Sequence, residues 1–452
     1  MKKSILLYRS LLLLIFSLPL LAEAQWHKEM DLTQTFVTSP VFDSQMRTYL
    51  SPIKNERLPS LVLIHGVGGS AKDFTEVIPL LKGRYNLIVF DLPGYGESKS
   101  STTLYSASNY AINLSVVLPS LVSKTNYIVG HSMGGNIALQ LSAMSPQLVD
   151  KLVLIDPAGI LNKFSYSKYI ALDKVDDVPF VSPKYQKKLS RFIDSVSDYV
   201  HDFTDILLSE PSRKYVLDNN SIFISAVSVM NEDLTLVLRD VNVDTLIIWG
   251  ENDRVMPYQT GYMLDSVLAN STLELLPKLG HSPQREAPEL VHNLINTFID
   301  NTQASALEQS DAVNLAGSLV HDCNISSNNL DGKSYYEVII INCENLNIDH
   351  LSTASLTIID SKVSFSYLNI QNTVGFAIAA FDSNVALWGG NIVGEHIANI
   401  NTSYVDLNGV NIVAEAAPFK TDGFSQVLAS ASMMNEKGTA TPLHGFVVKQ
   451  NN

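Results

Sequence analysis

The sequence predicts an α/β fold in its first two thirds, with a mostly parallel sheet and helices on both faces, followed by an all-β domain. Up to about residue 300, short apolar runs of strand length alternate with stretches of helix length. Such alternation is typical of parallel sheets, because each crossover between parallel strands needs a helix. Beyond residue 315, a strand-length motif repeats about every 20 residues, as in the coils of a parallel β-solenoid.

The N-terminal residues 1–24 have the pattern of a secretory signal peptide. Basic residues precede a short apolar run that contains Pro19, and Ala22-Glu23-Ala24 fits a cleavage site. The run is short for a membrane span, although an uncleaved anchor is the alternative interpretation. Cleavage takes the formal charge from −14 to −16. We therefore expect an exported protein, periplasmic or extracellular, with no stable membrane anchor after signal removal.

The composition limits the classes of partner and site. With 452 residues and 46% hydrophobic residues, the chain can form two or more domains with their own cores. Its acidic charge and the lack of a Lys/Arg cluster argue against a nucleic-acid partner. Two cysteines, Cys323 and Cys343, are too few for a disulfide scaffold, and no Cys/His cluster accompanies them. We expect no metal and no cofactor.

The elements of the first domain follow in a regular order. Residues 31–50 predict an edge hairpin around Pro40, and helical patterns cover 73–82, 107–122, the stretch after 132, and 287–299. The runs expected as buried parallel strands are 60–64, 86–90, 127–129, 151–155, 245–249 and 271–276.

The Gly-x-Ser-x-Gly stretch at residues 130–134 joins one of these strands to a helix. This order suits a tight turn that presents Ser132 as a nucleophile, since Gly130 and Gly134 leave room for the strained backbone. The helix that follows directs its positive N-terminal end at the serine. An isolated motif of this kind could also be a loop serine between ordinary glycines, so the rest of the chain must decide.

Two other loops at the carboxyl ends of strands complete a catalytic set, because such loops converge at one edge of the sheet. They hold Asp253 and His281, and the order Ser132, Asp253, His281 is that of hydrolases with this topology. His281 would take the serine proton and return it to the leaving group, while Asp253 would orient the imidazole. Asp156, at another strand end, is the alternative acid. A capping or buried histidine is the alternative role for His281.

Motifs along residues 30–300 resemble those of the α/β-hydrolase superfamily. Within it, the similarity is to capped lipases and esterases that also look like meta-cleavage-product hydrolases. The resemblance implies an oxyanion hole made by the backbone N–H groups of Val67 and Met133. It also implies that His65 and Gly66 support this loop. The matching segments are 65–69, 91–98, 130–135, 156–159, 249–253 and 280–283.

The alternating pattern is interrupted over residues 160–240. Helical stretches rich in Phe and Tyr occupy this region. An insertion there would lie above the carboxyl ends of the strands, so we interpret it as a helical cap that closes the site and lines an acyl pocket. The alternative is that these aromatic residues form the core of the cap itself.

The repeat in the last third has the frame Ser-x-Val-x-aromatic/Leu-x-x-x-Asn-Ile. It occurs at 361–370, 383–392 and 403–412, and a weaker copy begins near Leu346. Cys323 and Cys343 are one period apart, so equivalent positions in successive coils would bring them within reach of a disulfide. Two free thiols are the alternative. Adhesion to a surface or partner, substrate presentation and structural support all remain open as roles of this domain.

The sequence thus predicts a signal peptide at 1–24, a hydrolase domain at 25–301, a linker at 302–314 and a solenoid domain at 315–452. The leading hypothesis is an exported serine hydrolase that cleaves small-molecule or lipid esters. A C–C bond hydrolase with the same three residues is one alternative, and a non-catalytic adhesion protein led by the solenoid is another. Truncation near residue 302 is expected to leave short-ester hydrolysis largely intact.

Overall fold

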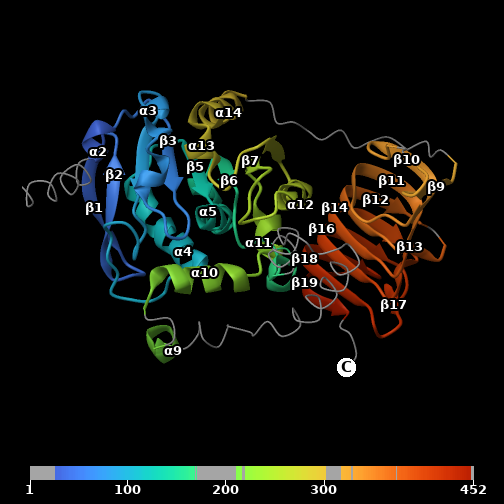
Figure 1. Cartoon of the computed structure of the whole chain (residues 1–452). Helices are drawn as coiled ribbons and strands as arrows, with labels where there is room; N and C mark the ends of the chain where they lie inside the picture. Colours follow the sequence, from blue (N-terminus) through green and yellow to red (C-terminus); the bar gives the residue numbers. More distant parts are fainter. Residues whose placement is uncertain are drawn as a thin grey trace, which may run out of the picture.

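The computed structural model describes two sheets and the helices around the first of them (Figure 1). The predicted signal peptide, the predicted linker and most of the predicted cap lie outside the described residues. The described residues are 26–167, 169, 210–215, 219–301, 317–326, 329–372 and 374–448.

The first sheet has eight strands in the order β1-β2-β4-β3-β5-β6-β7-β8. Strand β2 runs antiparallel to both of its neighbours, and β3 to β8 are all parallel. The predicted edge hairpin and the predicted parallel sheet are therefore confirmed. The bounds are β1 Thr33–Ser39, β2 Ser44–Leu50, β3 Ser60–Ile64, β4 Asn86–Phe90, β5 Asn126–His131, β6 Lys151–Ile155, β7 Asp244–Gly250 and β8 Ser271–Leu276.

Helices cover both faces of this sheet because side chains alternate between faces along each strand. Val62 packs with α4 and α5 on one face, whereas its neighbours Leu61 and Leu63 pack with α3 and α14 on the other. All five residues of β3 are buried, as its continuous apolar run predicts. The helices are α2 Trp26–Glu29, α3 Ile78–Leu81, α4 Ala107–Val117, α5 Met133–Met144, α9 Glu210–Tyr215, α10 Ser221–Asn231, α11 Thr235–Asp240, α12 Gln259–Val267, α13 Pro283–Glu286 and α14 Pro288–Asp300.

The helix predicted over residues 73–82 is wrong as a single element. The structure has a 3-10 turn at Ala71–Phe74 and a separate short helix, α3. Pro79 lies in the first turn of α3. Because proline has no backbone N–H and its ring clashes with the preceding turn, it is accepted at a helix start but not inside a continuous helix.

The second sheet is all-β and mostly parallel, as predicted. The three motif strands β12, β14 and β16 pair in parallel, with Val363, Val385 and Val405 in register. The weaker copy pairs as well, with Leu346 opposite Val363. The last strand, β19, is antiparallel to β18, which no repeat indicated. The bounds are β9 Leu319–Asp322, β10 Lys333–Ile341, β11 Leu346–Ile359, β12 Lys362–Gln371, β13 Phe376–Phe381, β14 Asn384–Gly394, β15 His396–Asn401, β16 Tyr404–Ala414, β17 Phe419–Thr421, β18 Gln426–Glu436 and β19 Thr439–Val448.

A ladder of buried serine hydroxyls explains the serine of the repeat. The N–H of Ser361 donates to Ser383 Oγ at 3.1 Å, and the N–H of Ser383 donates to Ser403 Oγ at 2.9 Å. Each hydroxyl thus satisfies a buried backbone donor of the neighbouring coil, which would otherwise cost free energy. In the coil before Ser361, Cys343 occupies the corresponding position and its N–H donates to Ser361 Oγ at 3.0 Å.

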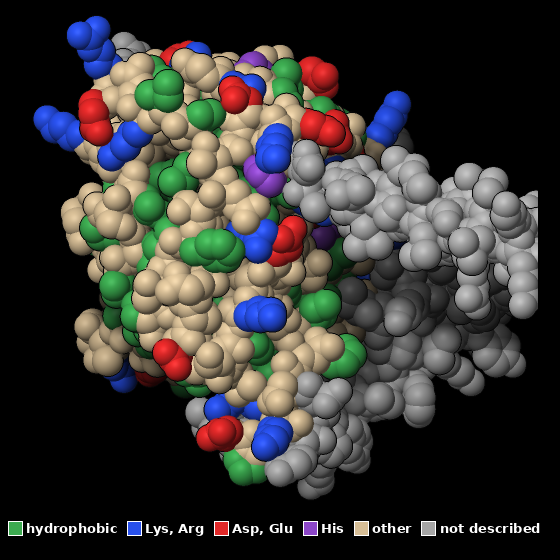
Figure 2. Space-filling model, turned by 90° about the vertical axis from the view of Figure 1, so that its left-hand side faces the viewer, with side chains coloured by type: hydrophobic (Ala, Val, Ile, Leu, Met, Phe, Trp, Pro, Cys, Tyr) green, Lys and Arg blue, Asp and Glu red, His purple; other side chains and the backbone are tan. Residues whose placement is uncertain are grey.

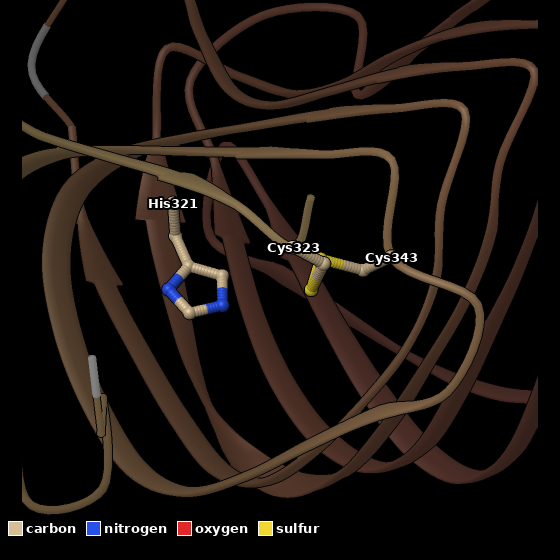
Figure 3. Close-up of side chains that lie close together, drawn as sticks. All are labelled: His321, Cys323 and Cys343. Carbon is tan, nitrogen blue, oxygen red and sulfur yellow. A yellow bond between two sulfur atoms is a disulfide. The ribbon is translucent and has the colours of Figure 1, made fainter. Parts of the chain in front are cut away.

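Cys323 and Cys343 form a disulfide in the first coils of the solenoid (Figure 3). Their Cα atoms are 5.1 Å apart, and 20 residues separate them in sequence. The disulfide inferred from the repeat period is therefore present.

Replacing Cys343 with Ser is expected to lower the free energy of unfolding of the solenoid by about 3 kcal/mol. A cross-link between residues 20 apart restricts the unfolded chain, and loops of this size contribute about that much. Denaturant titration of the oxidised protein checks this value. The double variant that also carries Cys323→Ser controls for a free thiol. If both variants unfold at the wild-type midpoint, the disulfide does not stabilise this domain.

The two sheets are joined through α11 and α12, which lie between them (Figure 1). The main apolar cluster of the first domain also contains Trp388 and Ala431 of the solenoid. Ser266 of α12 accepts a hydrogen bond from the N–H of Gly390 at 3.0 Å and donates to the carbonyl of Gly409 at 3.3 Å. The solenoid therefore packs directly against the first domain and contributes side chains to its apolar cluster.

On the described part of the surface seen from the side of β1 and β2, charges of both signs are mixed (Figure 2). Figure 2 shows Lys and Arg side chains scattered among Asp and Glu on this face. In the part of the chain that the structure describes, no helix is both long and apolar enough to cross a membrane.

Candidate active site

The turn at Ser132 is built from glycines that nothing larger can replace. Ser132 joins β5 to α5 with φ 54° and ψ −120°, a backbone conformation that is strained for a residue with a side chain. A Cβ atom on Gly130 would lie 2.2 Å from the carbonyl oxygen of Gly134, and one on Gly134 would lie 2.1 Å from that of Ile64. The supporting roles expected for both glycines thus have a steric basis.

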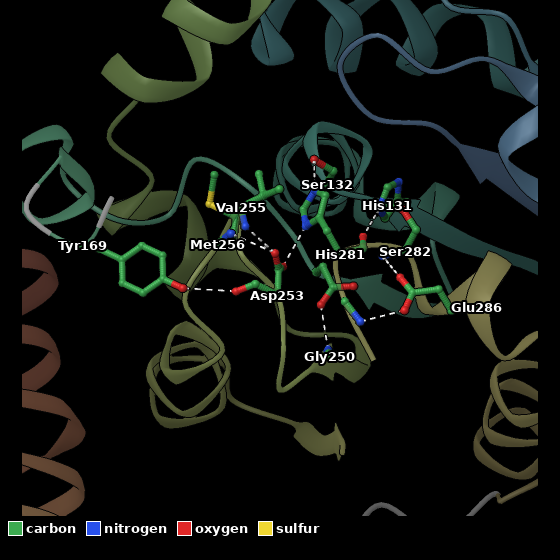
Figure 4. Close-up of polar contacts among 12 residues, drawn as sticks. His131, Ser132, Tyr169, Gly250, Asp253, Val255, Met256, His281, Ser282 and Glu286 are labelled. Atoms are coloured by element: carbon green, nitrogen blue, oxygen red, sulfur yellow. Dashed lines mark hydrogen bonds and ion pairs between the residues drawn. The ribbon is translucent and has the colours of Figure 1, made fainter. Parts of the chain in front are cut away.

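The structure brings the three predicted catalytic side chains together (Figure 4). The Ser132 Oγ lies 3.0 Å from His281 Nε2, and His281 Nδ1 lies 2.7 Å from Asp253 Oδ2. The geometry suits a hydroxyl that donates to Nε2 and an Nδ1–H that donates to the carboxylate. Ser132 and Asp253 are buried, and His281 is partly exposed.

Asp253, and not Asp156, faces the imidazole. The other carboxylate oxygen of Asp253 accepts hydrogen bonds from the N–H groups of Val255 at 2.7 Å and Met256 at 3.0 Å. These two donors fix the direction of the carboxylate and stabilise its charge. Asp156 instead accepts from the N–H of Gly250 at 2.9 Å. Burial, with a smaller contribution from the charge of Asp253, raises the pKa of Asp156 well above its ordinary value. Burial thus disfavours the charged form of Asp156.

The predicted oxyanion donors border the serine. Met133 is the first residue of α5, so its backbone N–H has no carbonyl partner within the helix. The loop that carries Val67 runs directly against the nucleophile, because a Cβ atom on Gly66 would lie 2.7 Å from Ser132 Cβ. Glycine at 66 thus lets the backbone approach the place where an oxyanion would form.

His65 is buried and braces this loop. The N–H of Leu92 donates to His65 Nε2 at 3.0 Å, so the proton of the ring is on Nδ1, which donates to the carbonyl of Gly66 at 2.8 Å. Burial lowers the pKa of His65, which keeps the ring neutral. With both nitrogens in use, His65 holds the loop and is not placed to exchange protons with Ser132.

Two residues that support His281 were not identified from the sequence. His131 Nε2–H donates to the carbonyl of His281 at 2.6 Å, and burial together with the neighbouring His281 lowers the pKa of His131 to about 3. Glu286 accepts from the N–H groups of Gly280 at 2.8 Å and Ser282 at 3.2 Å (Figure 4). The proximity of Glu286 to the His281 loop, just before α14, was an available signal, whereas nothing local pointed to His131.

Within the described ranges, two groups of three side chains bring metal-ligand atoms within 4.8 Å of one another. In the group of His131, Asp156 and His281, both ring nitrogens of His281 are already hydrogen-bonded. The second group corrects the expectation that no Cys/His cluster accompanies the cysteines. His321 lies beside Cys323 and Cys343, but the two sulfurs are bonded to each other (Figure 3). We assign a metal to neither group.

The described part of the predicted cap is helical and borders the site. Ile222 of α10 lies 3.9 Å from the position of a Cβ atom on Gly68, in the glycine turn. At the end of α10, Glu232 accepts hydrogen bonds from Gln140 Nε2 at 3.1 Å and Ser228 Oγ at 3.2 Å. Burial raises the pKa of Glu232 to about 7, and the hydrogen bonds only partly oppose this shift. Of the aromatic residues expected here, those between 170 and 209 lie outside the described residues.

Glu232→Gln is expected to reduce the loss of stability between pH 5 and pH 8. The folded state binds the Glu232 proton more tightly than the unfolded chain, so this contribution is complete below about pH 4.5 and is lost as the pH rises through about 7. The difference is of the order of 2 kcal/mol. Denaturant unfolding at both pH values measures it, with Glu56→Gln on the surface as the control. Equal pH dependence in all three proteins would contradict the assignment.

Comparison with known proteins relates this chain to a family. Residues 61–294 match the family model described as "Alpha/beta hydrolase family". The chain is 32% identical over 264 residues to an uncharacterized hydrolase, YugF, of Bacillus subtilis, covering 56% of this chain and 94% of that protein. It is 27% identical over 245 residues to Lipase 3 of a Moraxella species, covering 53% of this chain and 77% of that lipase. It is also 29% identical over 253 residues to a 2-hydroxy-6-oxononadienedioate/2-hydroxy-6-oxononatrienedioate hydrolase of Pseudomonas putida, covering 53% and 87%.

Proposed function

Because this chain belongs to the α/β-hydrolase family, we propose that it is a serine hydrolase that cleaves carboxylic esters of small molecules or lipids. The observation that carries the proposal is the unbroken line of hydrogen bonds from Ser132 through His281 to Asp253. A serine hydroxyl is a poor nucleophile at neutral pH, and this arrangement provides a base at the hydroxyl and a fixed negative charge behind the base.

The reaction proceeds in two halves. Ser132 Oγ attacks the ester carbonyl while His281 Nε2 takes its proton, and the N–H groups of Val67 and Met133 bind the negative oxygen. The imidazolium then protonates the departing alcohol, which leaves an acyl-enzyme. Water attacks this intermediate with His281 again acting as the base, and the acid is released with Ser132 restored.

Cleavage of a C–C bond in a vinylogous diketone is the second candidate. It rests on the similarity to the Pseudomonas putida hydrolase and would use the same three side chains. The similarity to Lipase 3 of Moraxella supports the ester substrate instead.

A fluorophosphonate probe and a substrate panel test these proposals together. We expect covalent labelling of Ser132, hydrolysis of p-nitrophenyl esters of graded chain length, and little turnover of a vinylogous diketone. The opposite substrate preference would make the protein a C–C hydrolase. Absence of both labelling and turnover would overturn the enzymatic proposal and favour an adhesion protein.

We further propose that the protein is exported, on the basis of the signal-like residues 1–24. The mature chain would begin at Gln25, and the Cys323–Cys343 disulfide suits an oxidising compartment. N-terminal sequencing of the protein from periplasmic and culture fractions tests this proposal. Recovery of the uncleaved chain from the cytoplasm would contradict it.

A further inference from the structure

Residues 162–167 and Tyr169, a segment that follows β6 and its loop, lie between the solenoid and the turn that carries Asp253. One end of the segment contacts strands of the solenoid, and the other end contacts the main chain of the proposed catalytic acid. The solenoid contacts come from β16 and β18, and their residues are 241 and 268 positions away in sequence.

On the solenoid side, the segment is held by buried polar contacts. The N–H of Asn162 donates to Ser430 Oγ at 2.9 Å, and Ser165 Oγ donates to Asp406 Oδ1 at 3.0 Å. All four of these residues are buried. Hydrogen bonds between buried groups are costly to leave unmade, so these two contacts favour this position of the segment on the solenoid.

On the catalytic side, the Tyr169 hydroxyl donates to the carbonyl oxygen of Asp253 at 3.1 Å (Figure 4). This contact restrains the same residue whose carboxylate is aimed at His281 by the N–H groups of Val255 and Met256. Because the turn carries both groups, a shift of the Asp253 carbonyl would also move its carboxylate relative to the imidazole.

The solenoid packs closely against the first domain. A Cβ atom on Gly389 would lie 2.6 Å from Ser266 Cβ, and one on Gly409 would lie 2.5 Å from Met263 Cγ. Tyr367 of the solenoid also donates a hydrogen bond to Asp265 of α12. The solenoid surface that contacts Asn162 and Ser165 is therefore packed against α12, the helix that follows β7 and the Asp253 turn.

We propose that the solenoid contributes to catalysis, because its contacts with Ser165 position Asp253 through Tyr169. The hydrogen bond from Ser165 to Asp406 holds the segment on the solenoid. The hydrogen bond from Tyr169 to the Asp253 carbonyl then restrains the acid. Ser165 and Tyr169 are both positioning residues, because neither touches the reacting atoms. The inference rests on the proposed function, since it assumes that Asp253 orients His281. Displacements of about 1 Å in a catalytic group can cost about 100-fold in rate.

A double-mutant cycle tests this pathway in the full-length protein. Ser165→Ala and Tyr169→Phe are each expected to lower kcat for p-nitrophenyl acetate by about 5- to 20-fold, with KM changed less than 2-fold. The double variant should lose no more than the worse single variant, because both changes break the same link. Ser425→Ala removes another buried hydroxyl of the solenoid, which accepts from Ser403 N–H and contacts neither residue, and should leave kcat unchanged.

Hydrogen exchange of the peptide at residues 250–258 gives a readout that does not depend on activity. The amides of Val255 and Met256 should exchange at least 3-fold faster in Ser165→Ala and Tyr169→Phe, and at the wild-type rate in Ser425→Ala. Suppose that the wild type hydrolyses esters. The inference is then wrong if the double variant's loss in kcat equals the product of the two single losses, or if the single variants keep the wild-type kcat. If the wild type hydrolyses no ester, the proposed function fails. The positioning of Asp253 is then judged by hydrogen exchange alone. Unchanged exchange at 250–258 in the two variants would overturn it, and faster exchange would support it.

Discussion

Ser132→Ala is expected to abolish ester hydrolysis, with a loss of about 10⁴- to 10⁶-fold in kcat and complete loss of fluorophosphonate labelling. Among the described residues, no other hydroxyl is hydrogen-bonded to His281, so none of them is placed to replace the nucleophile. The remaining turnover would come from water attack assisted by the N–H groups of Val67 and Met133. Steady-state kinetics with a short p-nitrophenyl ester measures the loss.

The same substitution should leave stability within about 1 kcal/mol of the wild type, because it removes one atom from a residue that is not packed for stability. Ser142→Ala is the matched control. It makes the same chemical change within α5, the helix that follows Ser132, where Ser142 Oγ donates to the carbonyl of Ala138 at 2.8 Å. Turnover above one per cent in a folded Ser132→Ala protein would remove Ser132 from the mechanism.

Deletion of the solenoid is expected to give an insoluble or inactive protein, contrary to what the sequence indicated for truncation near residue 302. The apolar cluster of the first domain includes Trp388 and Ala431, which deletion would remove. It would also uncover Met263 and Val267 of α12. Each large apolar side chain returned to water costs about 1.5 to 3 kcal/mol, and a domain has only about 5 to 15 kcal/mol in total. Solubility, circular dichroism and ester hydrolysis of residues 25–301 measure the outcome.

Substitutions at two glycines test the contact between the solenoid and α12 without deleting a domain. Gly409 and Gly423 both have positive φ, at 66° and 84°, so alanine strains the backbone at either position. Only at Gly409 would the new Cβ atom meet the first domain, 2.5 Å from Met263 Cγ, whereas nothing lies within 4 Å at Gly423. Gly409→Ala should therefore lower stability and activity more than Gly423→Ala. Equal effects, or a fully active fragment, would show that the contact is dispensable.

Much of the fold was predictable because its signals are local. Continuous apolar runs such as β3 mark strands buried on both faces, and the glycines around Ser132 mark a turn that only glycine allows. The solenoid register was predictable because each coil repeats the contacts of the last, so Val363, Val385 and Val405 had to align. The helix expected over 73–82 failed because a proline within it outweighed the amphipathic pattern.

The candidate site was predictable as a set of residues at strand ends, but not as a geometry. Asp156 and Asp253 both follow parallel strands. The family-like Gly-x-x-Asp-x-Val turn at 250–255 favoured Asp253, but only the structure shows its carboxylate hydrogen-bonded to the imidazole. His131 and His281 are 150 residues apart, so their contact follows only from the packing of two loops.

From the sequence alone came the element types, the strand register of the repeat, and the chain order of Ser132, Asp253 and His281. These depend on backbone conformation and on periodic burial, which neighbouring residues decide. The tertiary structure alone showed that Asp253, and not the alternative Asp156, is hydrogen-bonded to His281. It alone showed which groups brace the His281 loop, and that the solenoid packs on α12 and contacts Asn162 and Ser165. These contacts form between surfaces far apart in the chain, and their energies arise only when both surfaces are folded and brought together.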